Sequence, residues 1–326
     1  MSGQSLTVWC NQHLSPNLSE TLRERLAGHR LVFAPKLSKS NLSAAAVDPL
    51  LAESDIALGQ PDPAQCMNVP RIKWIHLTTA GYTRYDNDVF RKAMQARGTP
   101  VTNSSMVYAE PCAQHCLAYM LAMSRRLPQC VDDQRTTRAW HALEHRAACQ
   151  VLSGQTVLIL GFGAIAKRLV QLLAPLKLNV IAVRRRAEGS EGCRVESTER
   201  IDELLPSADY VMNILPANES TRHFMNAARF ARMKSTASYY NIGRGATHDQ
   251  LALDRALREK QIAFAYVDVG DPEPLPTDHP LWTAPNCYIT PHTAGGMLDE
   301  FEQLVEHFLQ NFDRFVKGQP LNDRVI

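Results

Sequence analysis

A glycine-rich turn between two short apolar runs constrains the fold of this chain more than any other stretch. The first run, Thr156–Leu160, has the continuous apolar character of a strand that is buried on both faces of a parallel sheet. It leads directly into the turn at residues 161–166, and apolar residues then recur at helical spacing until the second run at residues 179–183. A G-x-G-x-x-A turn set between a strand and a helix predicts a dinucleotide-binding βαβ unit.

The residues of this turn suit a bound pyrophosphate. Gly161 permits the tight bend, Gly163 lets the backbone approach the phosphates without a Cβ, and Ala166 is small enough for the helix to pack on the strand. The first N–H groups of the helix have no partner within it, so they attract anionic oxygens. A glycine turn that serves packing alone is the alternative. We expect five residues of the turn to bind the cofactor: Gly161, Phe162, Gly163, Ala164 and Ile165.

The end of the second run indicates which dinucleotide is bound. An NAD site usually has an acidic residue there to hold the ribose hydroxyls, but the chain reads Arg184-Arg185-Arg186 and has no acidic residue before Glu188. A guanidinium pairs with a 2′-phosphate through parallel hydrogen bonds, whereas a carboxylate would repel it. A solvated basic loop is the alternative. We predict that Arg184, Arg185 and Arg186 bind the cofactor, and that NADP(H) is preferred over NAD(H).

Length, charge and cysteine content narrow the class of protein. With 326 residues the chain is long enough for two domains, each with its own core. The net charge of +2 gives no reason to expect a nucleic-acid or membrane partner, and no stretch resembles a signal peptide or a membrane span. Eight scattered cysteines without a C-x-x-C pair are typical of a reduced, cytoplasmic protein. Cys112 and Cys116 flank His115, but their apolar surroundings favour buried thiols, so we expect no metal site.

Strands alternate with helical segments along the chain, which predicts parallel sheets. We expect a helix at residues 18–26 with Ser19 near its N-cap, and a C-terminal helix at 297–316 that returns to the first domain. The strands expected in the first domain are 6–10, 30–33, 55–59, 73–77 and 100–103.

A long apolar helix at residues 109–127 is expected to connect the domains and to end at Pro128. The polar segment 129–146 then leads to the glycine-turn domain. For Trp140 and His141 in this segment we expect packing within a loop, with an active site or a partner subunit as the alternatives.

Three short motifs fall where predicted strands of the second domain end: Asn241–Gly245, Asp268–Pro274 and Thr290–Gly296. Open α/β sheets bind ligands at the carboxyl ends of their strands. Together the motifs supply an arginine, a carboxylate and a histidine. Reduction of a ketone beside a nicotinamide needs these groups, because an acid must protonate the oxygen, a carboxylate can orient that acid, and a cation polarises the carbonyl. Taken singly, each residue is more simply explained as a surface or loop residue.

With these motifs in place, the chain resembles the D-isomer-specific 2-hydroxyacid dehydrogenases, and most closely their glyoxylate/hydroxypyruvate reductase-like members. The resemblance also runs through Thr79-Ala80-Gly81, Val101-Thr102-Asn103 and His279-Pro280-Leu281. It implies an α/β protein with two Rossmann-like, doubly wound parallel-sheet domains. The substrate domain, flavodoxin-like, would comprise residues 1–104 plus 297–326, and the NAD(P)-binding domain residues 105–296. It also implies a homodimer that pairs through the nucleotide domain.

The resemblance assigns roles to individual residues. It implies that His292 is the acid/base, that Glu273 supports it, and that Arg244 binds the carboxylate and ketone of the substrate. It further implies that backbone N–H groups at Ala80 and Gly81 bind the substrate carboxylate. Asp268 would hold the nicotinamide carboxamide. The full set of additional cofactor contacts is Leu215, Pro216, Ile242, Asp268, His292 and Gly295.

The implied reaction is the NADPH-dependent reduction of a small 2-oxo acid, such as glyoxylate or hydroxypyruvate, to the D-2-hydroxy acid. Two departures from many relatives, Met106 in place of Gly and Gly270 in place of Phe, bear on pocket shape rather than on chemistry. Two alternatives remain: an NAD-linked oxidation such as that of 3-phosphoglycerate, and an NAD(H)-sensing corepressor on the same fold. The intact Arg244, Glu273 and His292 favour the reductase over the corepressor.

Overall fold

The computed structural model describes residues 5–38, 46–185 and 192–326. The chain forms two compact units. The first unit comprises Met1–Tyr108 with Met297–Ile326, and the second comprises Ala109–Gly296. The assignment of substrate binding to the first unit and of cofactor binding to the second stays a prediction at this point.

The first unit contains a five-stranded parallel sheet in the order β2-β1-β3-β4-β5. This is the strand order of flavodoxin-like folds, in which the order reverses between β1 and β3. Its strands and helices are β1 (Thr7–Gln12), α1 (Pro16–Arg25), β2 (Arg30–Ser38), α2 (Pro49–Ala52), β3 (Ile56–Gly59), α3 (Pro63–Asn68), β4 (Trp74–Leu77), α4 (Asp88–Arg97), β5 (Val101–Thr102) and α12 (Glu300–Val316).

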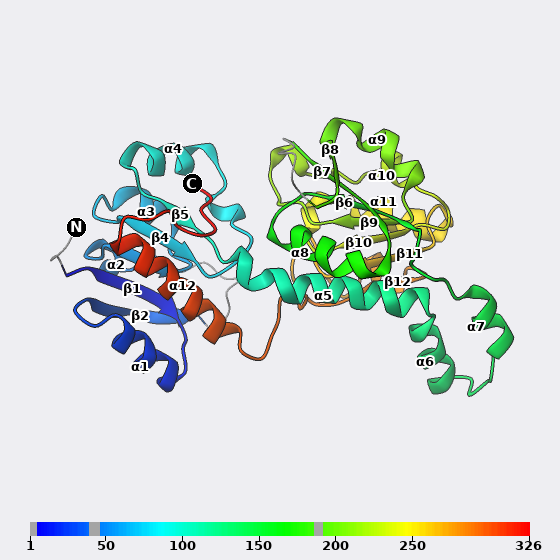
Figure 1. The fold of residues 1–326 in the computed structure, drawn as a ribbon, viewed down its shortest axis with the longest axis horizontal. Coiled ribbons are helices and arrows are strands. Elements are labelled where there is room, and N and C mark those ends of the chain that lie inside the picture. The colour runs from blue at the N-terminus through cyan, green and yellow to red at the C-terminus, as the bar shows by residue number, and fades with distance from the viewer. Residues whose placement is uncertain (1–4, 39–45, 186–191) are drawn as a thin grey trace. The chain divides into compact units, whose positions relative to one another are not determined.

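Both faces of this sheet are buried, because side chains alternate along each strand and helices cover the two sides. Val8 of β1 belongs to a core cluster with residues of α1 and α12, whereas its neighbour Trp9 belongs to the cluster on the opposite face. Trp74 of β4 stacks on Phe308 of α12, with ring centroids 5.2 Å apart. Figure 1 shows α12, in red, lying along the strands of this unit. The last long helix of the chain is therefore part of the core formed by the first strands.

The second unit contains a seven-stranded sheet in the order β12-β11-β10-β9-β6-β7-β8, in which every pair of neighbours is parallel. Counted from β6, six of these strands have the dinucleotide-binding order 3-2-1-4-5-6. The elements are α5 (Ser105–Ser124), α6 (Leu127–Arg135), α7 (Ala142–Ala148), β6 (Thr156–Leu160), α8 (Ala164–Leu173), β7 (Asn179–Arg184), β8 (Arg194–Ser197), α9 (Ile201–Leu204), β9 (Tyr210–Asn213), α10 (Ala227–Phe230), β10 (Ser238–Asn241), α11 (Gln250–Arg258), β11 (Phe264–Val267) and β12 (Cys287–Ile289). The predicted fold class, two doubly wound parallel sheets, is confirmed.

Several predicted helix ends are wrong. The N-cap of α1 is Ser15, whose side chain accepts a hydrogen bond from the Leu18 N–H, and not Ser19. Helix α5 ends at Ser124, before Pro128. Arg126 has a left-handed backbone conformation and separates α5 from α6, and Pro128 lies in the first turn of α6. A proline without an N–H is tolerated in a first turn, so Pro128 starts a helix instead of ending one.

The segment predicted as a polar connection, residues 129–146, forms most of α6 and α7. These two helices project from the end of α5 in Figure 1. The loop packing expected for Trp140 is wrong, because this side chain is 94% exposed. His141 is exposed as well. Among the described residues, no helix is long and apolar enough to cross a membrane.

Candidate active site

The glycine turn has the geometry that a bound pyrophosphate needs. Gly161 has a φ of 92°, and a Cβ on it would lie 3.1 Å from the Ile214 carbonyl oxygen, so a larger residue would be strained in conformation and closely packed. Nothing lies within 4 Å of the Cβ position of Gly163, the N-cap of α8. No side chain caps α8, which leaves the N–H groups at the start of this helix, at Ala164 and Ile165, facing an open site. These residues fit a dinucleotide phosphate.

A cavity of about 620 Å³ lies beside this turn. Arg184 and Arg185 line it from the end of β7, and no aspartate or glutamate is among the described residues that line it. Arg186, the third predicted arginine, lies outside the described residues. The predicted contacts Phe162, Leu215 and Pro216 also line the cavity. Its lining is therefore basic where an NAD site would be acidic.

Sequence reasoning missed the polar side chains that complete this cavity. Thr198, Asn218 and Ser220 line it together with the arginines. Asn218 and Ser220 follow β9 in a polar run that begins two residues after Pro216, and their position after a strand end was the available signal. Thr198 follows β8, a strand that was not predicted, so nothing in the sequence placed it beside the arginines.

His292 and Glu273 come from two neighbouring strand ends and meet in the second unit. His292 Nδ1 lies 2.8 Å from Glu273 Oε2, and the other oxygen, Oε1, accepts a hydrogen bond from the Gly270 N–H at 3.0 Å. Because a carboxylate only accepts, Nδ1 carries the proton in this pair, and Nε2 remains for a ligand. The His292 side chain is 24% exposed, so it is held by its partner yet open on one side.

The charge of Glu273 is stabilised by its neighbours. Burial acts to raise the pKa of Glu273, but the His292 hydrogen bond and charge, the Gly270 N–H and the Arg244 charge together lower it below its usual value. Glu273 is therefore ionised at neutral pH and stabilises a positive charge on His292.

Arg244 is placed by a tightly packed backbone. Its carbonyl oxygen accepts hydrogen bonds from the Asn241 amide and the Thr247 hydroxyl, and its Nη1 donates to the Gly243 carbonyl at 2.6 Å. A Cβ on Gly245 would lie 2.0 Å from the Gly270 carbonyl oxygen, so only glycine lets these two strand-end loops meet. The predicted group of Arg244, Glu273 and His292 thus gathers at neighbouring strand ends.

Asp268 shapes the turn that carries His292. The side chain is buried, and it accepts hydrogen bonds from the Thr290 hydroxyl and from the N–H groups of Thr293 and Ala294. Gly295 continues this turn, next to Ala294. The predicted contact of Asp268 with the nicotinamide carboxamide stays a prediction.

Ile242 is buried, and its N–H donates to the Asn213 carbonyl, which connects the ends of β10 and β9.

The loop predicted to bind the substrate carboxylate follows β4 in the first unit. The Asn103 side-chain amide donates to the Ala80 carbonyl at 2.6 Å, and the Thr79 hydroxyl donates to the Gly81 carbonyl at 2.7 Å. The Ser104 N–H holds the Thr79 carbonyl at 3.0 Å. With their carbonyl oxygens held, Ala80 and Gly81 have N–H groups with no partner among the described residues. Because the loop belongs to the other unit, its meeting with Arg244 stays a prediction.

The two cysteines of α5 are buried, as expected. Burial raises the pKa of the Cys112 thiol to about 12, and it raises that of Cys116 as well. Both are therefore neutral thiols that pack in the core and do not act as nucleophiles.

Comparison with known proteins gives a consistent result. The family model described as "D-isomer specific 2-hydroxyacid dehydrogenase, NAD binding domain" matches residues 117–294. The chain is 31% identical over 290 residues to glyoxylate/hydroxypyruvate reductase B of Escherichia fergusonii, and the match covers 86% of each chain.

Solved structures show the same likeness over the whole length. A D-isomer specific 2-hydroxyacid dehydrogenase family protein from Aeromonas salmonicida matches with a TM-score of 0.76 and 26% identity over 99% of both chains. A D-isomer specific 2-hydroxyacid dehydrogenase from Xanthobacter autotrophicus Py2, solved in complex with NADPH and MES, matches with a TM-score of 0.79 and 25% identity, over 99% of this chain and 98% of that one. The family match over more than half of the chain and the 31% identity to the curated relative show that the chain belongs to the D-isomer specific 2-hydroxyacid dehydrogenase family.

Proposed function

We propose that the chain is an NADPH-dependent reductase that converts a small 2-oxo acid of the glyoxylate or hydroxypyruvate class to the D-2-hydroxy acid. The observation that carries the proposal is the His292–Glu273 pair, 2.8 Å apart, with Arg244 close enough for its charge to act on Glu273. The name of the Escherichia fergusonii relative, a glyoxylate/hydroxypyruvate reductase, supports this class of substrate.

In the proposed reaction, the bound nicotinamide supplies a hydride to the ketone carbon. His292 donates the proton on Nε2 to the ketone oxygen as negative charge develops there. Glu273 accepts the Nδ1–H throughout, which fixes the orientation of the ring and stabilises its protonated form before the transfer. Arg244 pairs with the substrate carboxylate and polarises the ketone.

The substrate carboxylate has a second set of proposed donors in the first unit. We assign this role to the N–H groups of Ala80 and Gly81, supported by the hydrogen bonds that hold the carbonyl oxygens of the same loop. Oriented backbone N–H groups of a small-residue loop suit an anion. Under this assignment, the predicted substrate domain, residues 1–104 plus 297–326, corresponds to the first unit, Met1–Tyr108 with Met297–Ile326. The predicted cofactor domain, residues 105–296, corresponds to the second unit, Ala109–Gly296.

The preference for NADP(H) is supported by the cavity beside the glycine turn. Arg184 and Arg185 line it, and an acidic side chain is absent from its described lining. Thr198 and Ser220 add hydroxyl donors for a 2′-phosphate. NAD(H) lacks this phosphate, so it would not form these charge-assisted hydrogen bonds.

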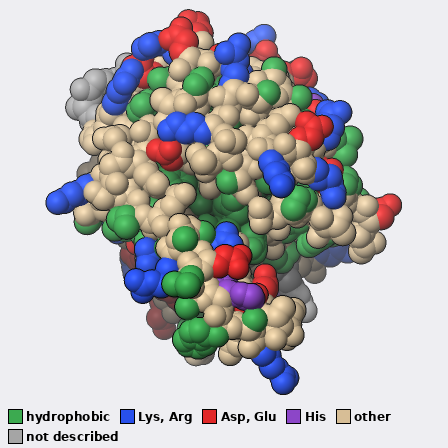
Figure 2. All heavy atoms as spheres, turned by 90° about the vertical axis from the view of Figure 1, so that its right-hand side faces the viewer, with side chains coloured by type: hydrophobic (Ala, Val, Ile, Leu, Met, Phe, Trp, Pro, Cys, Tyr) green, Lys and Arg blue, Asp and Glu red, His purple; other side chains and the backbone are tan. Residues whose placement is uncertain are grey.

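A homodimer that pairs through α6 and α7 is part of the proposal. Among the described residues, six of the thirteen exposed large hydrophobic side chains lie between Leu121 and Val151, and they include Trp140 and Leu143, which is 85% exposed. Figure 2 looks onto this end of the second unit and shows hydrophobic side chains gathered on its projecting lower part and directly above it. Apolar side chains concentrated on a projection are typical of a surface that a second subunit covers.

The test is a spectrophotometric assay of NADPH and NADH oxidation with glyoxylate, hydroxypyruvate, pyruvate and phenylpyruvate. We expect turnover with NADPH and one of the first two acids, and a fall in kcat of about a hundredfold to ten-thousandfold in His292→Ala, because the proton donor is lost. An unchanged midpoint of thermal unfolding in His292→Ala is the control for folding.

Two outcomes would contradict the proposal. Equal turnover by the wild type and His292→Ala would show that another group protonates the ketone. Tight cofactor binding without turnover of any 2-oxo acid would favour the NAD(H)-sensing corepressor.

A further inference from the structure

The first unit contains a cavity of about 740 Å³ that the proposed reaction does not use. It lies where the strands of the sheet begin: Leu6 precedes β1, His29 precedes β2, Lys73 precedes β4 and Pro100 precedes β5. The loop proposed for the substrate carboxylate lies at the other end of β4. The cavity is therefore at the edge of the sheet opposite to that loop, and its volume is in the range of small-molecule sites, roughly 300–1,000 Å³.

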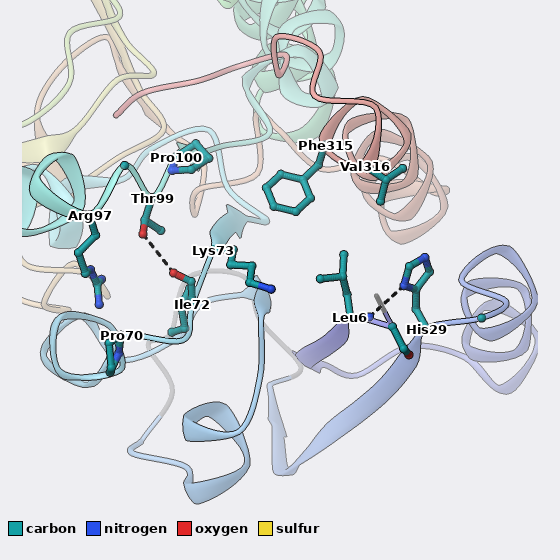
Figure 3. A pocket seen from close by; sticks show the side chains of 13 residues that line it. Leu6, His29, Pro70, Ile72, Lys73, Arg97, Thr99, Pro100, Phe315 and Val316 are labelled. Atoms are coloured by element: carbon teal, nitrogen blue, oxygen red, sulfur yellow. Dashed lines mark hydrogen bonds between the residues drawn. The ribbon is translucent and has the colours of Figure 1, made fainter. Parts of the chain in front are cut away.

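Part of the cavity lining is apolar. Leu6, Ile72, Phe315 and Val316 contribute to it, and the last two come from the end of α12. In Figure 3, Phe315 and Val316 face Lys73 and Leu6 across the open space. An apolar wall of this kind favours a ligand with an apolar body, because burying such a body removes its surface from water.

Two cationic side chains also line the cavity. They are Lys73 and Arg97, and no aspartate or glutamate is among the described residues that line it. Lys73 Nζ pairs with Asp55 at 3.0 Å, but Asp55 also binds Arg71, at 3.3 Å, and its side chain is only 4% exposed. The carboxylate is shared between two cations and withdrawn from solvent. Lys73 therefore keeps N–H bonds and net positive potential for a ligand anion.

His29 adds a second oriented donor. Its Nδ1 accepts a hydrogen bond from the Leu6 N–H at 3.1 Å, so in the neutral ring the proton is on Nε2. The ring also packs edge-on against Phe312, with centroids 5.0 Å apart, which holds its plane. Figure 3 shows His29 beside Val316, with the hydrogen bond to Leu6 fixing one ring nitrogen. The other ring nitrogen, Nε2, is left as a donor in a side chain that lines the cavity.

We propose that this cavity is a binding site for a small organic monoanion with an apolar body. Lys73 and the His29 Nε2–H bind the anionic group, and Ile72, Phe315 and Val316 contact the body of the ligand. The site is built within the first unit alone and shares no residue with Arg244, Glu273, His292 or the loop at Ala80 and Gly81.

The probe for this site is 3-phenylpropionate, with the neutral 3-phenylpropionamide as its matched analogue. Binding to the full chain saturated with NADP⁺ is measured by isothermal titration calorimetry.

Lys73→Met removes the cation, and Val316→Trp fills the cavity without touching the Lys73–Asp55 pair. Lys92→Met, at an exposed lysine that does not line the cavity, is the control. Arg244→Ala tests whether the acid occupies the catalytic site instead. Thermal unfolding of each variant verifies its fold.

We expect saturable binding of one acid per chain. Affinity should fall about tenfold or more for the amide, for Lys73→Met and for Val316→Trp, because each loses a charge-assisted hydrogen bond or the space for the ligand. Lys92→Met and Arg244→Ala should bind like the wild type.

Three results would overturn the proposal: no saturable binding by the wild type, affinity in Lys73→Met and Val316→Trp equal to that of the wild type, or loss of binding in Arg244→Ala. None of these readouts depends on turnover, so failure of this proposal can be distinguished from failure of the proposed reductase function.

Discussion

Glu273 acts through His292 in the proposed reaction and does not itself contact the substrate. Glu273→Gln keeps the shape of the side chain and a hydrogen-bond acceptor but removes the charge that stabilises the protonated ring. We expect kcat/KM for reduction to fall about tenfold to a hundredfold, and the decline of the rate with rising pH to begin at lower pH than in the wild type. A pH profile of kcat/KM with NADPH and glyoxylate measures both.

The pKa of Glu273 determines the pH below which its carboxylate loses the charge. Since it is lowered from the ordinary value of 4.5, the carboxylate stays ionised at all pH values above that value and loses its charge only below it. Wild type and Glu273→Gln should therefore differ throughout the neutral range. An unchanged pH profile in the variant would show that Glu273 has only a structural role.

The two described arginines at the end of β7 are expected to select the cofactor. Replacing both, Arg184→Ala with Arg185→Ala, should raise the KM for NADPH about tenfold to a hundredfold, because charge-assisted hydrogen bonds to the 2′-phosphate are lost. The KM for NADH should change little. Arg232→Ala, at an exposed arginine outside the cavity, is the matched control. An equal rise for NADH and NADPH would contradict a role in phosphate recognition.

For single residues, spatial grouping could be predicted from the sequence where a motif is continuous along the chain. Arg244, Glu273 and His292 each lie in a short motif directly after a strand, so the fold could only bring them to one edge of the sheet. Thr198 could not be found in this way. It follows β8, a strand that was not predicted, and its place beside the arginines is a property of the folded unit.

Among the elements, the amino ends of β1, β3 and β4 are joined by one buried carboxylate. Asp55 accepts the Thr7 N–H at 2.9 Å and pairs with Lys73 and Arg71. Burial acts to raise the pKa of Asp55, but these partners together lower it below the ordinary value of 3.8. A lowered pKa means that ionised Asp55 stabilises the fold fully above the unfolded value, and that this contribution is lost as the pH falls through the folded value.

We therefore expect Asp55→Asn to lower the free energy of unfolding at neutral pH by about 1–3 kcal/mol, because the ion pairs are lost. The difference from the wild type should shrink as the pH falls below 3.8, where the wild-type carboxylate also loses its charge. Urea denaturation followed by circular dichroism at a series of pH values measures this. A difference that stays constant down to about pH 2 would show that the charge is not what stabilises these strands.

Strands and helices could be predicted from the sequence where they are rich in apolar residues. The buried strand β6 has five residues of continuous strand character, and it was found at its exact bounds. Strand β8, Arg-Val-Glu-Ser, has a single apolar residue, because it lies at the edge of the sheet and its side chains are partly exposed. Helices α6 and α7 have no buried residue, so neither shows the apolar stripe that reveals a helix packed on a core.

For the whole molecule, the exposed face of α6 and α7 predicts the oligomeric state. Leu143→Asp should shift the protein from dimer toward monomer, since it places a charge in an apolar interface. Leu251→Asp, at a leucine of α11 that is 59% exposed, is the matched control and should remain dimeric. Sedimentation velocity at several concentrations distinguishes the two. A wild-type monomer, or a Leu143→Asp dimer of undiminished stability, would rule out this interface.

The two-unit organisation was predictable because each unit repeats the alternation of apolar strand and helix. The position of the last helix was predicted from its apolar spacing and from the family resemblance. How it packs was not accessible to sequence reasoning, because the stacking of Phe308 on Trp74 joins residues that are far apart along the chain.

The return of the chain to its first unit also determines an order of events during synthesis. The second unit is one continuous segment and can fold as soon as it has left the ribosome. The first unit lacks α12 until that helix has been made, and the open edge of β5 is bound by the Val325 and Ile326 N–H groups, which pair with the Val101 carbonyl. Its strands are made before the second unit but complete their core after it. A nascent chain therefore exposes the face around Val8 and Trp74 until α12 is made, and this is the surface that a chaperone would have to protect.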